Sequence, residues 1–236
     1  TTTDGTTAVG YNSLAALTTG ARNIAVGAYG LDALTVGDDN IALGFGAMGA
    51  LSTVDGSDKN IAIGTYAMDD VGGLAATQNI FIGYDSGGGS WTGTLSEKNV
   101  AIGNYTMDAA MNDADQNVAI GHNALSSVTS GSGSVCIGAY AGDAITTGDR
   151  NTAIGNTSAS ALTIGKYNTA LGFEALLADD VGDTTVAVGY QALANQNSDS
   201  DNETTGNTAV GYAVGLEQTT GTNNTYLGYI LSLIHI

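Results

Sequence analysis

The stretch Gly206-Asn207-Thr208-Ala209-Val210-Gly211-Tyr212 decides the fold, because close copies of it recur along the chain. Thirteen copies align on the glycine after the Ala-aliphatic pair, which we call the anchor glycine. The anchors are Gly10, Gly27, Gly44, Gly64, Gly83, Gly103, Gly121, Gly138, Gly155, Gly172, Gly189, Gly211 and Gly228. The shortest interval, that from Gly10 to Gly27, recurs in seven of the twelve cases, and the other five intervals are longer. A period of about 17 residues that lengthens but never shortens indicates a fixed coil with a tolerant loop.

The residues before the anchor alternate in a way that is typical of a β-strand. The residue just before the anchor is Val, Ile or Leu in all 13 copies, and the residue three before it is always β-branched. Ala lies between them in ten copies. This alternation has period 2 and gives one bulky face and one small face. We therefore predict an all-β fold, a parallel β-solenoid or β-roll of about 13 coils, with a second short strand or a turn after each anchor.

Two further features of the repeat lead to structural expectations. Asn lies four residues before the anchor in ten copies, and we expect these side chains to stack as an amide ladder. Short apolar segments such as 12–17 also fit a helical turn, but they are too short for a stable helix. The alternation leaves open whether the small Ala face meets neighbouring chains or points into the coil, with the β-branched face outward.

The composition excludes several classes of protein. The 236 residues include 35 Gly and no Pro, and five Lys and Arg stand against 23 Asp and Glu, for a net charge of −18. So few cations argue against sequence-independent binding to nucleic acid or to an anionic membrane. There is no apolar run of membrane-spanning length. A hydrophobic content of 43% argues against disorder, and the single Cys136 excludes an intrachain disulfide framework.

The repeat unit resembles two groups of fibrous proteins. Residues 168–173 and 206–212 show the unit best, and a Thr-Thr-Gly turn recurs at 18–20, 146–148 and 219–221. The unit is similar to β-roll repeats in the heads of trimeric autotransporter adhesins, and its longer Thr-Thr-Gly form is similar to repeats in phage tail-fibre proteins. The resemblance covers residues 1–229. It implies a homotrimer of parallel, left-handed β-rolls outside the cell, on a cell surface or virion, that binds a receptor or glycan.

The repeat is incomplete at the start of the chain and is interrupted at its end. The chain begins inside its own pattern, and residues 230–236 depart from the repeat. The segment 231–236 matches the translation of a sequencing-library adaptor. We therefore expect one β-roll domain over 1–229, a fragment at both ends, followed by a non-native tail at 230–236.

Acidic residues are the candidate metal ligands. Six before the anchor, seven copies carry a carboxylate; these residues are Asp4, Asp38, Asp58, Glu97, Asp115, Asp149 and Asp183. The simplest interpretation is a solvated acidic edge that keeps the coils soluble. The alternative is calcium, which prefers six to eight oxygen ligands, and the best candidates are Asp199, Asp201 and Glu203 in the longest insertion.

Catalytic and nucleotide-binding motifs find little support. Residues 44–49 match the dinucleotide fingerprint G-x-G-x-x-G, but no helix of useful length follows them. His122 falls in an aromatic column just after the anchor, where it fits a packing or surface role, and Cys136 replaces a core Ala. The aromatic column itself either packs over the turns, which we prefer, or forms a surface ladder for glycan stacking. Trp91 is the candidate exposed aromatic residue of an atypical copy.

The sequence therefore favours a non-enzymatic role. The leading expectation is a structural and adhesive fibre segment that presents or forms a receptor-binding surface. The alternatives are a monomeric β-solenoid that binds an ordered surface such as ice, and a calcium-stabilised surface or matrix protein. An enzyme is the least supported reading, because no insertion is long enough to build a cleft around paired carboxylates.

Overall fold

The chain folds as a parallel β-solenoid in which the same elements recur once per coil. The computed structural model describes residues 4–51, 56–71, 75–93, 95–198, 200–201 and 203–231. Within these ranges there are thirteen strands of three residues each and no helix. Each strand ends just before an anchor glycine, so the predicted all-β solenoid with one short strand per coil is confirmed.

The strands fall into two compact units of the same construction, Thr1–Asn117 and Val118–Ile236. The first unit contains β1 (Thr7–Val9), β2 (Ile24–Val26), β3 (Ile41–Leu43), β4 (Ile61–Ile63), β5 (Ile80–Ile82) and β6 (Val100–Ile102). The second contains β7 (Val118–Ile120), β8 (Val135–Ile137), β9 (Thr152–Ile154), β10 (Thr169–Leu171), β11 (Val186–Val188), β12 (Thr208–Val210) and β13 (Thr225–Leu227). The expectation of one domain over 1–229 stays a prediction.

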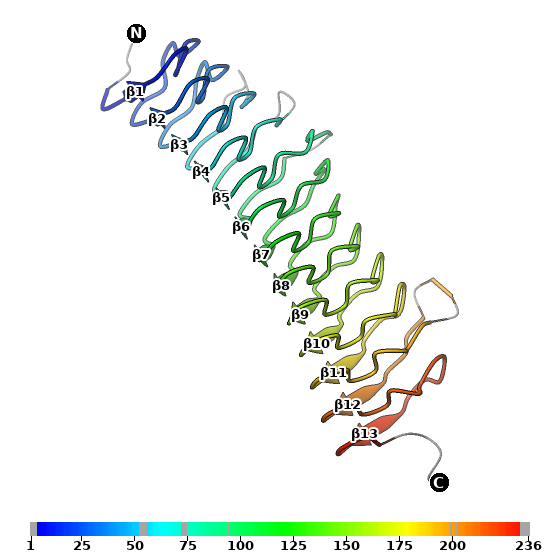
Figure 1. Cartoon of the computed structure of the whole chain (residues 1–236). Helices are drawn as coiled ribbons and strands as arrows, with labels where there is room; N and C mark the ends of the chain where they lie inside the picture. Colours follow the sequence, from blue (N-terminus) through cyan, green and yellow to red (C-terminus); the bar gives the residue numbers. More distant parts are fainter. Residues whose placement is uncertain are drawn as a thin grey trace. The chain divides into compact units, whose positions relative to one another are not determined.

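Neighbouring coils within each unit are joined by parallel strand pairing in chain order (Figure 1). The register is the same whatever the length of the coil. Ala25 of β2 pairs with Ala42 of β3 across one of the shortest intervals, and Ala42 pairs with Ala62 of β4 across a longer one. The extra residues of long coils therefore lie outside the paired strands, as the lengthening period indicates.

Small and aliphatic side chains fill the interior of each coil. The strand Ala is fully buried from β2 onward, for example at Ala25, Ala62 and Ala119. Four residues after the anchor, Leu or Met enters the same interior, as Leu31 and Met68 do. Of the two orientations that the alternation left open, the structure shows that the small face points into the coil and the β-branched face points outward.

The segment after each anchor is a turn and not a second strand. The second and fourth residues after the anchor have left-handed backbone angles in coil after coil, for example Tyr29 (φ 59°) and Leu31 (φ 50°). Such angles are costly for Tyr and Leu. They persist because the turn buries the Leu side chain and hydrogen-bonds to the next coil, where Leu31 N donates to Ala47 O at 3.1 Å.

The predicted Asn ladder is confirmed, and it lies in the core. Asn40, Asn60, Asn79 and Asn99 are fully buried. Each amide nitrogen donates to the side-chain oxygen of the Asn one coil earlier, as Asn60 Nδ2 does to Asn40 Oδ1 at 3.0 Å. It also donates to a backbone carbonyl of the following coil, as Asn60 Nδ2 does to Ala76 O at 2.6 Å. Each Asn therefore satisfies buried polar groups on both neighbouring coils.

Candidate functional site

The outer face of the strands in each unit carries aliphatic side chains and, in some coils, Thr. The residues three and one before the anchor flank the buried Ala and are exposed or half-exposed. Ile102 is 38% exposed, Leu171 41% and Val210 37%. Because every coil adds one aliphatic side chain and a second that is Val, Ile or Thr, we call this surface the aliphatic face. Contiguous exposed apolar surface of this kind is typical of protein interaction sites.

A row of aromatic rings lies at the surface just after the anchors of the first unit. The rings are, in order, Tyr11, Tyr29, Phe45, Tyr66, Tyr84 and Tyr105. They come alternately from the first and the second position after the anchor. Neighbouring centroids lie 5.4–6.4 Å apart, with the ring planes 71–89° to each other. This alternation of backbone position gives edge-to-face packing.

The second unit has a row of a different geometry. His122 and Tyr140 keep the edge-to-face arrangement, with centroids 5.4 Å apart. The next row is stacked and consists of Phe173, Tyr190, Tyr212 and Tyr229. All four occupy the first position after the anchor, so the rings repeat with the coil and lie parallel, with interplanar angles of 7–18°.

These aromatic rows correct the expectation that the rings pack over the turns. The rings pack on one another and remain at the surface, with Tyr84 42% and Tyr212 46% exposed. The sequence reading considered only the first position after the anchor and therefore missed Tyr29, Tyr66 and Tyr105. His122, read as a packing or surface variant, takes its place in a row.

Trp91 is not an exposed aromatic residue, which corrects the sequence-based candidate. Its side chain is 2% exposed, its Nε1 donates to Gly87 O at 3.1 Å, and its ring meets Phe81 edge-on. Phe81 takes the place of the strand Ala, and Gly87 takes the place of the buried Leu or Met. The larger side chain of Phe81 is thus compensated by the missing side chain of Gly87 in the same coil. The Trp91 indole occupies the rest of the interior volume.

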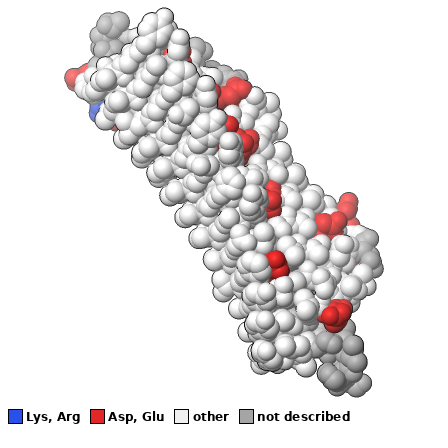
Figure 2. Space-filling view, viewed as in Figure 1, with Lys and Arg blue, Asp and Glu red and all other residues white. Residues whose placement is uncertain are grey.

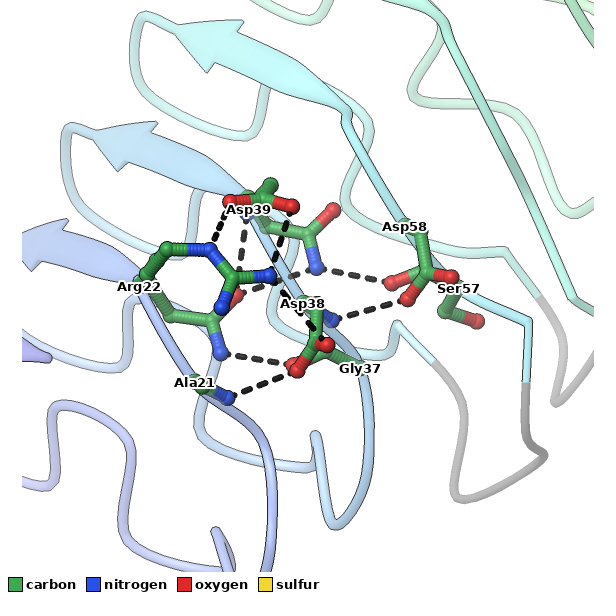
Figure 3. A network of polar contacts seen from close by, with 9 residues as sticks. Ala21, Arg22, Gly37, Asp38, Asp39, Ser57 and Asp58 are labelled. Atoms are coloured by element: carbon green, nitrogen blue, oxygen red, sulfur yellow. Dashed lines mark hydrogen bonds and ion pairs between the residues drawn. The ribbon is translucent and has the colours of Figure 1, made fainter. Parts of the chain in front are cut away.

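Several of the carboxylates six before the anchor bind the backbone of the preceding coil, so the solvated acidic edge is an incomplete description. Asp38 Oδ1 accepts from Ala21 N at 2.8 Å, and Asp58 Oδ1 accepts from Asp38 N at 2.8 Å (Figure 3). Asp149 and Asp183 do the same for Ser132 N and Lys166 N in the second unit. These carboxylates therefore act as links between coils.

Arg22 compensates part of the negative charge of this region. Its Nε lies 2.5 Å from Asp39 Oδ1, and its terminal nitrogen lies 3.4 Å from Asp38 Oδ2 (Figure 3). The hydrogen bond from Arg22 holds the pKa of the Asp39 carboxyl below its usual range. Beside this network, an open hollow of about 330 Å³ is lined by Thr19, Val36, Gly37, Asp38 and Asp58.

Two half-buried carboxyls of the first unit titrate near neutral pH. Burial, together with the nearby charge of Asp70, raises the pKa of Asp69 to about 6. Burial and the nearby charge of Asp85 raise the pKa of Asp108 to about 6. The space beside Asp69 exists because Gly49 has no side chain: a Cβ there would lie 2.7 Å from Asp69 Oδ1.

The calcium candidates are not brought together as a site in the described residues. Asp199 lies outside those residues, and Asp201 is exposed. The backbone carbonyl of Glu203 accepts from Asp183 N at 2.8 Å. Among the residues that the structure describes, no group of three or more His, Cys, Asp or Glu side chains is placed to hold a metal ion.

A buried polar cluster in the second unit is a feature that sequence reasoning missed. The seventh residue after the anchor is Leu17, Leu34 and Leu162 in some coils, but Asp179 and Gln196 in later ones. Both polar side chains are buried, and Gln196 Nε2 donates to Asp179 Oδ2 at 3.3 Å. Burial raises the pKa of Asp179. A comparison of the seventh position from coil to coil would reveal this change from Leu to Asp or Gln. In these coils a hydrogen bond replaces apolar packing.

Cys136 and the fingerprint-like segment 44–49 both belong to the framework of the coil. Cys136 is fully buried, and burial raises the pKa of its thiol to about 12, so the thiolate is scarce at neutral pH. Gly44, Gly46 and Gly49 of the fingerprint-like segment belong to a coil turn, which no helix follows in the described part of the chain. Much of the face drawn in Figure 2 carries neither Lys, Arg, Asp nor Glu.

No family model, curated protein or solved structure matches the chain. The structure has no helix, within its described ranges, that is long and apolar enough to cross a membrane. The fold is thus a parallel β-solenoid of short, regularly repeating coils.

Proposed function

We propose that this chain is a segment of a surface fibre, of the kind found in bacterial adhesins and phage tail fibres. The segment works outside the cell, on a cell surface or a virion, and presents or forms a receptor-binding surface. It assembles as a homotrimer of left-handed β-rolls and has no catalytic role.

The aliphatic face is the observation that supports this proposal. Two aliphatic or β-branched side chains per coil point outward beside a buried Ala, as Ile61 and Ile63 do beside Ala62. A β-sheet face of this composition is normally covered by other protein. Identical chains have identical coils, so copies that pack through this face keep their repeats in step along the fibre.

Light scattering coupled to size exclusion, on residues 1–229 with and without calcium, tests the assembly. We expect three times the chain mass, which is 23.5 kDa for the 236 residues. Replacing Val100 and Ile102 by Lys places two charges on the aliphatic face and should yield folded monomers, with circular dichroism unchanged. The control Asn156→Lys, at an exposed turn position, should leave the trimer intact.

A wild-type protein that stays monomeric would contradict the proposed trimer. A thermal-hysteresis assay would then test the alternative, a monomeric solenoid that binds ice. A mass that rises only with added calcium would favour the calcium-stabilised alternative.

A further inference from the structure

The stacked aromatic row of the second unit contains three consecutive tyrosines. The centroids of Tyr190 and Tyr212 lie 4.9 Å apart with the planes at 7°, and those of Tyr212 and Tyr229 lie 5.2 Å apart with the planes at 18°. The three side chains are 40%, 46% and 72% exposed. Three phenol rings are therefore held parallel and face to face, and they remain open to reagents in solution.

We propose that Tyr190, Tyr212 and Tyr229 form a site of oxidative cross-linking, where neighbouring tyrosines couple to dityrosine. The co-reactant is a one-electron oxidant, such as a peroxidase acting on hydrogen peroxide. Each of two phenols loses one electron and one proton to give a phenoxyl radical. The two radicals join through ring carbons next to the hydroxyl-bearing carbon, and both rings regain aromaticity by moving those ring hydrogens to oxygen. The net change is the loss of two electrons and two protons to the oxidant, with one new C–C bond.

The stacked geometry favours this coupling over the edge-to-face geometry of the first unit. In a parallel stack, the carbons beside the two hydroxyl groups lie along the same edge of the row. In an edge-to-face pair, one ring presents its edge to the face of the other, and a ring must turn before the carbons meet. Tyr84 and Tyr105 provide the matched comparison: their centroids lie 5.4 Å apart and their exposure is similar, but their planes are at 71°.

The sequence limits the site to two links. Phe173 stacks on Tyr190 with centroids 5.4 Å apart, but it has no phenol and forms no phenoxyl radical. Tyr226, the other tyrosine near the row, is 4% exposed, and its hydroxyl donates to Gln218 Oε1 at 2.8 Å. A link between Tyr190 and Tyr212, or between Tyr212 and Tyr229, would join consecutive coils covalently. It would restrict the unfolded chain in the way that a disulfide does.

Photo-oxidation followed by peptide mapping tests the proposal. The folded protein is illuminated briefly with a ruthenium tris-bipyridyl sensitiser and persulfate, which accepts the two electrons. It is then denatured and cleaved after Glu, which places Tyr190, Tyr212 and Tyr229 on separate peptides because Glu203 and Glu217 lie between them. We expect cross-linked peptide pairs that have lost two hydrogen atoms, with dityrosine fluorescence, and fragment ions that place the bond on Tyr229 and not on Tyr226.

Two substitutions separate geometry from general reactivity. Tyr212→Phe keeps the middle ring but removes its phenol, and both links of the row should be lost. Tyr105→Phe, in the edge-to-face row, should leave both links at wild-type yield. The proposal is overturned if Tyr84–Tyr105 couples as readily as the stacked pairs, or if a urea-unfolded sample gives the same links in the same yield. It is also overturned if the links of the row join separate chains, which a denaturing gel would reveal as oligomers.

Discussion

The Asn60 side chain binds polar groups of the preceding and the following coil. Its amide nitrogen donates to Asn40 Oδ1 and Ala76 O, and its side-chain oxygen accepts from Asn79 N at 3.1 Å. In Asn60→Ala, Asn40 Oδ1 still accepts from the backbone nitrogen of residue 60, but Ala76 O and Asn79 N are left buried and unpaired, each at a cost of about 1–3 kcal/mol. We expect a loss of about 2 kcal/mol or more in the free energy of unfolding, measured by urea denaturation.

A surface asparagine gives the matched control for this prediction. Asn156 also donates to a carbonyl of a neighbouring coil, Ala139 O at 3.1 Å, but it is exposed, so water replaces the lost bond. Asn156→Ala should change the free energy of unfolding by less than about 0.5 kcal/mol. Equal losses for Asn60→Ala and Asn156→Ala would show that burial of the ladder is unimportant.

The anchor glycines are fixed by two constraints at once. Gly121 has φ +134°, which side chains rarely adopt, and a Cβ there would lie 2.5 Å from Gly138 O of the next coil. Gly121→Ala should therefore cost at least about 2 kcal/mol in thermal or urea unfolding. Gly30 is the control, because a Cβ there meets its nearest atoms at 3.5 Å. Gly30→Ala should be neutral or slightly stabilising, and a large loss there would contradict this account.

For single residues, the sequence predicted the contacts that repeat in every coil, and it missed the contacts that depend on the residues of a neighbouring coil. The Asn ladder follows from the stacking of one column. The partner of Asp38 is the backbone nitrogen of Ala21, one coil earlier, and no local pattern names a backbone group as partner. The burial of Trp91 depends on Phe81 and Gly87 together, a combination that no single repeat column indicates.

The single coil is the element of this fold, and its interior volume is shared between two positions. Cys136 replaces the strand Ala, and Gly142 replaces the buried Leu found at Leu125 one coil earlier. A Cβ at Gly142 would lie 2.7 Å from Cys136 Sγ and 2.8 Å from Ile145 Cδ1. The larger residue at one position therefore requires the smaller residue at the other.

A double-mutant cycle measures this exchange. Gly142→Leu alone overpacks the coil and should cost about 1–3 kcal/mol. Combined with Cys136→Ala, it restores the pattern of the coil that contains Leu125, and we expect at least half of that loss to be recovered. The readout is the coupling free energy from urea denaturation of the four proteins. Additive effects would show that the two positions do not share space.

The geometry of the aromatic rows is also determined within the coil, by the position of the ring after the anchor. It could have been predicted from the sequence. Rings alternate between the first and second positions after the anchor in the first unit, and stay in the first position from Phe173 to Tyr229. Reading both columns together predicts alternating and parallel rings. The left-handed turn at Leu31 was beyond that reading, because Leu has no preference for such angles and only burial imposes them.

For the molecule as a whole, the two carboxyls with raised pKa values predict an unusual dependence of stability on pH. An unfolded Asp ionises near pH 4, whereas folded Asp69 and Asp108 have pKa values of about 6. The folded state binds protons more readily between these values, so these groups destabilise the first unit above pH 6. Their penalty falls as the pH drops through 6 and is gone below about 4.

The variant Asp69→Asn/Asp108→Asn isolates this effect. After allowance for solvent screening of half-exposed groups, we expect it to be about 1–2 kcal/mol more stable than wild type at pH 7.5. The difference should shrink towards zero at pH 4.5 in urea denaturation. Asp39→Asn should instead be less stable than wild type at pH 7.5, and this difference should shrink as the pH falls. The reason is that Arg22 lowers the pKa of Asp39 and stabilises its ionised form. A stability difference that does not change with pH would contradict this interpretation of Asp69 and Asp108.

The constant register of the strands has a consequence for how such a chain changes over generations. Ala25, Ala42 and Ala62 pair in line, although the second interval is longer than the first. Duplication or loss of one whole coil keeps the strand register at the junction, and the added residues of long coils lie outside the paired strands. The number of coils and the lengths of their loops can therefore change independently of each other, without a new register between the strands.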